Sequence, residues 1–418
     1  MTPADRIRAL QARGVVIPSP ALISLGDEVV VDRIHGPATT LYPGTQLRGR
    51  SLLIGPGCTL GAEGPVTVDD CALGRGVVLS GGSHAGSVYL DGAACGPGAQ
   101  VRPGCLLEEQ ASTAHTVGLK QTVLLPFVTL GSLINFCDVL MAGGTSRADH
   151  SEVGSSFIHF NFTPFGPRGD KATASLIGDV PQGVMLRSPR IFLGGQAGLV
   201  GPVHIDYGTV LAAGFVYRRD HGPHQLVVGE ALPTGTQPFH RERFRGVGAR
   251  VAKNLRYVGE LVALWHWYQQ ARLPWAGDAA LERELYCAAQ RVVAGAIEER
   301  LRQLGRLAEA LPASVASLAA EGGAAFAREL AVQQRFAAQW TEWSAALARY
   351  AELDQPEDRD RQRLVAGLGS HRAGGAGPGA ASFVAAIRQL DAESVAAGTR
   401  WLQRLVARVC AIATPLAA

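Results

Sequence analysis

The chain has 418 residues, a formal net charge of +3 and 51 glycines, with 47% hydrophobic and 18% charged residues. This composition excludes an intrinsically disordered chain and predicts more than one folded unit. The small net charge gives no indication of a nucleic-acid partner, although it permits a phosphorylated ligand. Seven scattered cysteines without a CxxC pair argue against a disulfide framework and a structural zinc site. No segment has the pattern of a signal peptide or a membrane span, so we expect a cytoplasmic protein without a membrane partner.

Residues 1–45 are expected to form a short helix and a lead-in to the next unit. Thr2-Pro3-Ala4-Asp5 combines an N-cap, a proline in the first turn and an acidic third residue. Gly14 follows as the stop signal. The helix is therefore predicted to lie between Thr2 and Gly14.

Residues 46–222 follow a six-residue period, which is clearest from Ile54 to Asp220. Apolar or small residues recur at this spacing in two runs, with a slip of the frame near Ser83: Ile54, Leu60, Val66, Ala72 and Val78, then Leu193, Leu199, Ile205 and Leu211. A β-sandwich rich in glycine turns is the alternative, but its strands recur about every 8–12 residues. The period predicts a left-handed parallel β-helix of hexapeptide repeats, in which three hexads make one coil and the apolar residue of each points inward.

After Arg219 the glycines thin out, and alanine, leucine, arginine and glutamate predict an all-α helical bundle over residues 240–418. The expected segments are a helix through Leu255 and Tyr268 that ends at Pro274, one from Asp278 towards Leu304, one over 324–351, a Gly/Ala-rich connection from His371 to Ala381, and one over 383–412. A basic run within this half is either a solvated face or an interdomain contact, or else it holds an anionic ligand such as a CoA phosphate: Arg241, Arg243, Arg245, Arg250, Lys253 and Arg256.

Three stretches break the repeat with polar or reactive groups, and they are the candidates for a site because loops between coils carry function. They run from Arg102 to Lys120, from Thr145 to His150 and from His159 to Lys171.

These stretches contain recognisable motifs. An Arg102-Pro103-Gly104 turn is followed eighteen residues later by Lys120, and an Asn161-Phe162 pair is followed by Lys171. Three further segments continue the pattern: Ser175-Leu-Ile-Gly-Asp179, Ile191-Phe-Leu-Gly-Gly195, and Gly208 to Asp220 with Ala212-Ala213-Gly214 inside it. From Arg102 to Asp220 the chain therefore resembles the acetyltransferase half of the bifunctional enzyme that makes UDP-N-acetylglucosamine from glucosamine 1-phosphate.

The resemblance implies acetyl-CoA as co-substrate, an amino-sugar phosphate or nucleotide sugar as acceptor, and a homotrimer with its sites between neighbouring β-helices. It assigns substrate binding to Arg102, Lys120, Asn161, Phe162 and Lys171. It assigns contacts with acetyl-CoA to Gly195, Ala213 and Arg218.

The chain also departs from the family. Ser132 stands twelve residues after Lys120, where the family has its catalytic histidine, and Phe162 replaces a tyrosine. His150 lies eighteen residues after Ser132, one full coil on, and beside Asp149 it is our candidate base, with His159 or His115 in reserve. Two further differences are Gly195 in place of a serine and the lack of a Gly-rich phosphate loop before the repeat, so we do not expect this chain to transfer uridylate as the relatives do. A second hypothesis is therefore a non-catalytic protein that binds a sugar nucleotide or serves as a scaffold.

Each candidate also has a structural interpretation. Asp149 and His150 suit a surface turn, Lys120 suits a solvated coil edge, and Arg102 suits a hydrogen bond within its own turn. Asn161 suits an internal asparagine ladder. A metal site formed by His150, His159 and Asp149 lacks any diagnostic spacing, so no metal is expected.

Overall fold

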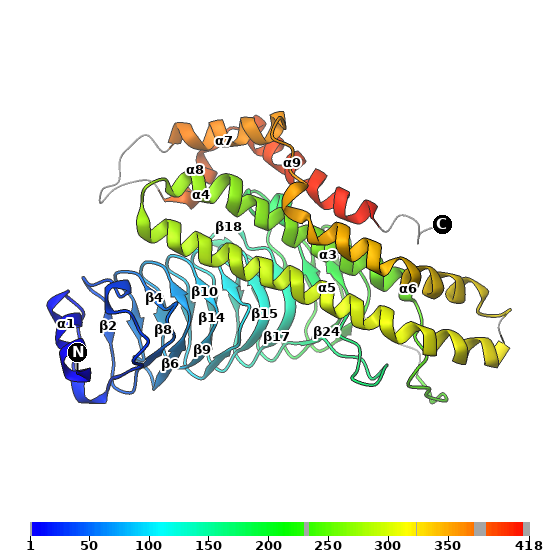
Figure 1. Ribbon diagram of the computed structural model, residues 1–418, viewed down its shortest axis with the longest axis horizontal. Coiled ribbons are helices and arrows are strands. Elements are labelled where there is room, and N and C mark those ends of the chain that lie inside the picture. Colours follow the sequence, from blue (N-terminus) through cyan, green and yellow to red (C-terminus); the bar gives the residue numbers. More distant parts are fainter. Residues whose placement is uncertain (1, 230–233, 323, 372–381, 413–418) are drawn as a thin grey trace.

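The computed structural model describes residues 2–229, 234–322, 324–371 and 382–412. In them the chain forms a left-handed parallel β-helix with layers of helices along one side (Figure 1). This confirms the predicted fold class. Strands occur between Ser24 and Val227, and the division into residues 1–45, 46–222 and 240–418 stays a prediction. Within the described part of the chain, no helix combines the length and the apolar character that crossing a membrane requires.

Helix α1 (Pro3–Ala12) lies at the N-terminal end of the β-helix (Figure 1). It begins where the sequence predicted, because the Thr2 side chain accepts a hydrogen bond from the Asp5 amide and the Asp5 carboxylate accepts one from the Thr2 amide. Arg6 donates to the carbonyl oxygens of Gly26 and Val29 at 2.8 and 2.5 Å. The helix therefore covers the apolar end of the coil stack, as a terminal cap of a solenoid must.

Each full coil contributes one strand to each of three faces, which we call A, B and C in the order in which the chain meets them. Face A is a ten-stranded parallel sheet: β2 (Thr40–Leu41), β5 (Thr59–Leu60), β8 (Val78–Leu79), β11 (Ala94–Cys95), β14 (Ser112–Thr113), β16 (Thr129–Leu130), β20 (Glu152–Val153), β23 (Phe192–Leu193), β26 (Val210–Leu211) and β28 (Leu226–Val227).

Faces B and C belong to one sixteen-stranded sheet, because β15 (Gly118–Leu124) and β17 (Asn135–Met141) bend from one face onto the other. Face B also contains β1 (Ser24–Leu25), β3 (Gln46–Arg48), β6 (Val66–Asp69), β9 (Gly82–Ala85), β12 (Ala99–Val101), β21 (Ile158–Phe160), β24 (Gly198–Val200) and β27 (Val216–Tyr217). Face C also contains β4 (Leu53–Ile54), β7 (Ala72–Leu73), β10 (Val88–Tyr89), β13 (Leu106–Leu107), β22 (Ser175–Ile177) and β25 (His204–Ile205). The chain turns between the faces at edges AB, BC and CA.

The inward residues of the coils form a continuous apolar stack. Leu193, Leu199, Ile205 and Leu211 are all fully buried, as the second run of hexads predicted. The first run is wrong from Ala72 onward, because Leu53 pairs with Ala72, nineteen residues on, and this coil is one residue longer than three hexads. Leu73 and Leu79 are therefore the inward residues. The six-residue pattern could not reveal the slip, since both neighbours at each position are apolar.

Edge BC shows how the chain turns without a glycine in every coil. Gly104, Gln121 and Asp138 occupy this edge in three successive coils with φ of 87°, 48° and 61°. A residue in this left-handed region is strained unless it is glycine or has a side chain that finds local hydrogen bonds. A Cβ on Gly104 would lie within 2.5 Å of the Gln121 side chain, so this position needs glycine for space as well. Asp138 instead accepts hydrogen bonds from two distant residues, Asn161 and Arg300.

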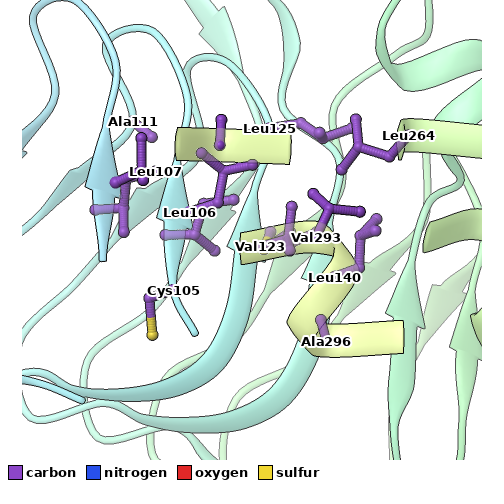
Figure 2. Close-up of a cluster of buried hydrophobic side chains, with 14 of the residues drawn as sticks. Cys105, Leu106, Leu107, Ala111, Val123, Leu125, Leu140, Leu264, Val293 and Ala296 are labelled. Carbon is purple, nitrogen blue, oxygen red and sulfur yellow. The ribbon is translucent and has the colours of Figure 1, made fainter. Parts of the chain in front are cut away.

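Face C differs from the other two because both residues are apolar or aromatic and buried in its strands β4, β7, β10 and β13. Leu106, Val123 and Leu140 point outward in three successive coils and are at most 1% exposed. Leu264 of α3 and Val293 of α5 pack against this row (Figure 2). An apolar face in water must be covered. The helices therefore lie along face C.

The helices after the β-helix are α3 (Val247–Trp267), a π-helix (Tyr268–Arg272), α4 (Leu273–Ala276), α5 (Ala280–Gly322), α6 (Ala327–Ala348), α7 (Arg359–His371), α8 (Phe383–Gln389) and α9 (Ala392–Ala411). Three of the expected boundaries are wrong. Pro274 lies in the first turn of α4 rather than ending the helix, because a proline is tolerated there. Helix α5 runs past Leu304 to Gly322 since Leu307, Leu311 and Leu318 continue its buried stripe. The expected last helix divides at Asp391, whose carboxylate caps α9.

Helix α7 was missed, and the expected connection from His371 to Ala381 lies, beyond His371, outside the described residues. Helices α7, α8 and α9 form an outer layer, in which α9 packs on α3 and α7 packs on α9 (Figure 1).

A buried cluster of charges joins the π-helix to edge CA. The Arg272 guanidinium donates to both carboxylate oxygens of Glu109, at 2.5 and 2.9 Å, and to Glu108 at 3.3 Å. The Tyr268 hydroxyl donates to the other Glu108 oxygen at 2.5 Å, and the Phe383 ring lies 4.5 Å from the guanidinium. Burial raises the pKa of Glu108 to about 7. One buried guanidinium thus forms ion pairs with two buried carboxylates.

We expect Arg272→Met to lower the free energy of unfolding by about 3–5 kcal/mol, because Glu108 and Glu109 would keep their burial without a cation. Arg283→Met on the exposed side of α5 is the control and should change little. Urea denaturation followed by circular dichroism measures both variants. Equal stability of the two would show that the cluster does not hold the helices on the β-helix.

Glu260 of α3 makes a second buried contact with the β-helix. Its carboxylate accepts a 2.8 Å hydrogen bond from the amide of Val180, the first residue of the short helix α2 (Val180–Gly183). Burial, and then the charge of Asp179, raises the pKa of Glu260 from 4.5 to about 8. The folded chain therefore holds this proton more tightly than the unfolded chain does, and the stabilisation is lost as the pH rises through this window.

We predict that Glu260→Gln removes this pH dependence while keeping an acceptor for Val180. Relative to the variant, the wild type should lose on the order of a few kcal/mol of unfolding free energy between about pH 5 and about pH 8. Denaturant titrations at several pH values measure the difference. Parallel pH profiles for the two proteins would contradict it.

Candidate functional site

The candidate site residues lie on three different edges of the β-helix. Edge BC carries Arg102, Lys120, Asn161, Phe162, Lys171 and Arg218; edge AB carries Ser132, Gly195 and Ala213; edge CA carries Asp149 and His150. The structure therefore brings together the predicted substrate-binding group within one chain. It does not bring the predicted base to that group within the same chain.

Edge BC presents a row of basic side chains at one register position. Arg102 follows β12, Lys120 ends the face B part of β15, and Lys120 pairs in register with Cys137 of β17. Neighbouring strands lie about 4.8 Å apart, so the three side chains leave the edge one above another. The interval of eighteen residues between Arg102 and Lys120 is thus one uninterrupted coil. We call Arg102, Lys120 and Cys137 the BC ladder.

The pKa of the Cys137 thiol depends on the charges around it. Burial raises its pKa, and the charge of Asp138 acts in the same direction. The positive charges of Arg102, Lys120 and Lys171 all act in the opposite direction. Three cations from separate segments therefore lie close enough to one atom to affect its ionisation. Such a group of cations is suited to a phosphate.

The segment from Asn161 to Ala174 leaves the coil beside the BC ladder, and we call it the BC loop. The Asn161 amide nitrogen donates a 2.7 Å hydrogen bond to the Asp138 carboxylate, while Phe162 is 53% exposed. The backbone carbonyl of Lys171 accepts a hydrogen bond from Arg300 of α5 at 3.1 Å. Asn161 and Lys171 are thus held at the base of the loop, where the coil is interrupted.

The helical region fixes the rest of the BC loop. Arg250 of α3 forms an ion pair with Asp170, and Asn254 donates to the carbonyl of Ala172 at 2.9 Å. Arg241 donates to the carbonyl of Gly166 at 2.9 Å. Four residues of the basic run, Arg241, Arg250, Lys253 and Arg256, thus contact the β-helix, as the interpretation of an interdomain contact predicted. Arg243 and Arg245 instead contact Glu321 and Phe326 within the helical region.

Arg218 lies on the same edge but three coils beyond the BC ladder. It follows β27, whose partner β24 is in turn the partner of β21. Its guanidinium donates to the carbonyl of Val216 at 3.4 Å. Arg218 thus shares the register position of the BC ladder, with Phe160 and Val200 at that position in the two coils between.

Edge AB stacks the residues assigned to acetyl-CoA with the serine at the family's histidine position. The Ser132 amide donates to the Ser155 hydroxyl at 3.1 Å, and the Gln196 amide donates to the Ser155 carbonyl at 2.8 Å. The Gly214 amide, next to Ala213, donates to the Gly195 carbonyl at 3.0 Å. Ser132, Gly195 and Ala213 therefore line one edge in order along the axis, with His115 one coil before Ser132.

His150 does not lie one coil after Ser132. The residue that follows Ser132 on edge AB is Ser155, because β16 pairs with β20, and a hairpin of β18 (Gly144–Ser146) and β19 (Asp149–His150) is inserted between them. The expectation of a regular eighteen-residue coil is wrong here. The insertion places His150 on edge CA, on the other side of face A.

His150 lines a cavity of about 560 Å³ on that edge. Its Nδ1–H donates to the carbonyl of Arg147 at 2.8 Å, which leaves Nε2 as the proton acceptor of the neutral ring. Asp149 accepts a hydrogen bond from Thr145 at 3.3 Å and lies 3.6 Å from Arg190, and so does not orient His150 as a catalytic partner would. The other lining residues are Glu152, Pro189, Phe192, Gly208, Val210 and His224.

His159 lies inside the coil stack and cannot meet a substrate. Its Nδ1 is 2.6 Å from the Cys137 carbonyl, its Nε2 is 2.8 Å from the Ser175 hydroxyl, and burial lowers its pKa to about 4. It is therefore wrong as a reserve base and cannot join His150 at a metal. In the described ranges, no group of three or more His, Cys, Asp or Glu side chains is arranged to hold a metal ion.

Sequence reasoning missed three residues in and beside the BC ladder: Cys137, Asp138 and Arg300. The first two were accessible, since they lie one coil after Lys120 and a polar residue beside a coil edge is a candidate for any site there. Arg300 was not accessible, because α5 is a separate element far along the chain and only the folded packing brings it to Asp138.

Comparison with known proteins supports the resemblance. A scan against protein-family models found no match. The bifunctional protein GlmU of Stutzerimonas stutzeri is 28% identical over 236 residues, which are 56% of this chain and 46% of that protein. GlmU of Thermotoga maritima is 27% identical over 227 residues (54% and 44%), and GlmU of Mycobacterium tuberculosis is 28% identical over 222 residues (53% and 39%). The chain thus spans less than half the length of these curated relatives. It is a hexapeptide-repeat β-helix protein that resembles the acetyltransferase half of GlmU.

Proposed function

We propose that the protein is an acetyltransferase that uses acetyl-CoA and acts on an amino-sugar phosphate or a nucleotide sugar. The observation that carries the proposal is the BC ladder, where Arg102 and Lys120 lie one above the other at one register position, with Lys171 of the BC loop beside them. These cations would bind the phosphate of the acceptor, with Arg102 able to donate two parallel hydrogen bonds. Phe162 would give the sugar ring an apolar surface.

The reaction makes two demands on the chain. The acceptor amine must be unprotonated to attack the thioester carbonyl, so a base must take its proton as the new amide bond forms and the CoA thiolate leaves. Donors must also face the oxygen that becomes negative in the tetrahedral intermediate. The backbone amides of Gly195 and Ala213 themselves would serve as those donors, since the amides of Gln196 and Gly214 already donate to carbonyl oxygens of edge AB.

His150 is the candidate base, and its place on edge CA sets a condition. Within one chain, face A separates edge CA from edge AB, and edge BC lies beyond face C. A homotrimer with sites between neighbouring β-helices would bring edges of different copies together. We therefore propose a homotrimer as the active form, with His150 supplied to the acceptor by a neighbouring copy.

The phosphate assignment predicts that Arg102→Ala and Lys120→Ala each weaken the binding of glucosamine 1-phosphate about tenfold, because each removes a charge-assisted hydrogen bond. Arg48→Ala is the matched control, since Arg48 lies at the same register position of edge BC three coils closer to the N-terminus. Isothermal titration calorimetry measures the dissociation constants. An equal effect of all three substitutions would refute the assignment.

The base assignment predicts that His150→Ala lowers acetyl transfer about a hundredfold or more, with little change in the binding of the sugar phosphate. His240→Ala, at an exposed histidine beyond the β-helix, is the control and should keep the activity. Release of CoA, detected with a thiol reagent, measures the rate. An unchanged rate in the His150 variant would remove this residue from the mechanism.

A second candidate function is a non-catalytic protein that binds a sugar nucleotide or serves as a scaffold. Two observations favour it: Ser132 stands at the family's histidine position, and His150 lies on a different edge from the BC ladder. Calorimetry with acetyl-CoA and with UDP-N-acetylglucosamine distinguishes the candidates. Binding of the sugar nucleotide without binding of acetyl-CoA, and no release of CoA with amino sugars, would favour this second function.

A further inference from the structure

We infer that Asp138 and Arg300 are positioning residues that fix the amide of Asn161 so that its oxygen faces the acceptor. The consequence is a requirement on the ligand: the group that meets Asn161 must be a hydrogen-bond donor, a hydroxyl or an ammonium of a phosphorylated sugar. This role rests on the proposed function. It assigns Asn161 to the sugar of the acceptor, whereas the cations of edge BC would bind its phosphate.

Asp138 is buried beside a cation. This carboxylate is 5% exposed and lies at the left-handed turn of edge BC, directly after Cys137. One of its oxygens accepts a 2.7 Å hydrogen bond from Arg300, which is itself 2% exposed. The Asp138 carboxylate thus accepts a hydrogen bond at each of its two oxygens, from Arg300 and from Asn161.

The Asp138 carboxylate fixes the orientation of the Asn161 side-chain amide. The other Asp138 oxygen lies 2.7 Å from the Asn161 side chain, so the amide must present its NH₂ group to it. The opposite orientation would place two oxygens against each other. Asn161 is half-buried, and the oxygen of its side-chain amide is the atom that remains for a ligand. A ligand group at this oxygen must therefore donate.

Arg300 connects Asn161 to Lys171, one of the cations proposed to bind phosphate. Arg300 uses its second nitrogen to donate to the backbone carbonyl of Lys171 at 3.1 Å. One guanidinium from α5 thus holds both ends of the BC loop, Asn161 through Asp138 and Lys171 directly. The helices fix the separation between the group that would bind phosphate and the group that would read the sugar.

This arrangement distinguishes a sugar phosphate from phosphate alone. Inorganic phosphate would engage the cations and gain nothing from Asn161. Glucosamine 1-phosphate would engage both, so damage to the Asn161 support should weaken the sugar phosphate and leave phosphate nearly unchanged.

The test is a double-mutant cycle on the full chain with Asp138→Asn, Asn161→Ala and their combination, titrated with glucosamine 1-phosphate and with inorganic phosphate. Each single substitution should raise the dissociation constant of the sugar phosphate about tenfold. The double variant should be no worse than Asn161→Ala, because Asp138 acts through Asn161. The dissociation constant of inorganic phosphate should change less than about threefold.

Two outcomes would overturn the inference. Additive effects in the cycle would show that Asp138 acts independently of Asn161, and equal losses for both ligands would show a general structural role. A wild type that binds neither ligand would refute the proposed function and the inference with it, which separates the two failures.

Arg300→Lys covers the case in which Asp138→Asn does not fold. It keeps the buried charge but not the two-pronged contact with Asp138 and Lys171, and it should weaken the sugar phosphate more than phosphate. Arg302→Lys is the matched control on the exposed side of α5, where Arg302 pairs with Glu299, and it should bind both ligands like the wild type. Equal behaviour of these two arginine variants would count against the inference.

Discussion

The need to cover face C determines how the rest of this molecule is arranged. A β-helix whose outward residues are polar on all faces is complete in itself, but Leu106, Val123 and Leu140 form an apolar row on the outside of face C. Helices α3 and α5 bury this row, and α6 and α9 then pack on α3 and α5. The helical region is therefore not an appendage at the end of the β-helix. It is the missing layer of one face.

Apolar contact fixes which face is covered, and buried charges fix the register along it. Arg272 reaches Glu108 and Glu109 near the middle of the β-helix, while Arg300 reaches Asp138 two coils further on. A hydrophobic row permits sliding, whereas a guanidinium buried without its carboxylate is costly. The same contacts that set the register also support the BC loop, so the placement of the candidate site depends on the packing of the helices.

The sequence predicted the β-helix well because its period comes from local geometry that repeats in every coil. The pair of Arg102 and Lys120 was accessible from the sequence for the same reason, since one regular coil separates the two residues. It failed for His150 because the β18–β19 hairpin interrupts the coil after Met141, and no periodic pattern indicates how many residues leave the stack. Arg300 was beyond sequence reasoning, because its partner Asp138 lies 162 residues away in the chain.

The helical layer also restricts how copies of the proposed acetyltransferase can assemble. With face C covered, a neighbouring copy can meet the β-helix of the described chain at faces A and B and at the edges between the faces. These two faces carry exposed apolar side chains in the later coils, Phe192 on face A and Ile158 and Phe160 on face B, each between 37% and 42% exposed. Ile158 and Phe160 lie directly before Asn161, next to the BC ladder. A neighbour that covered them would approach Asn161 from the side opposite to Arg300. The proposed site would then lie between the helices of its own chain and a second copy.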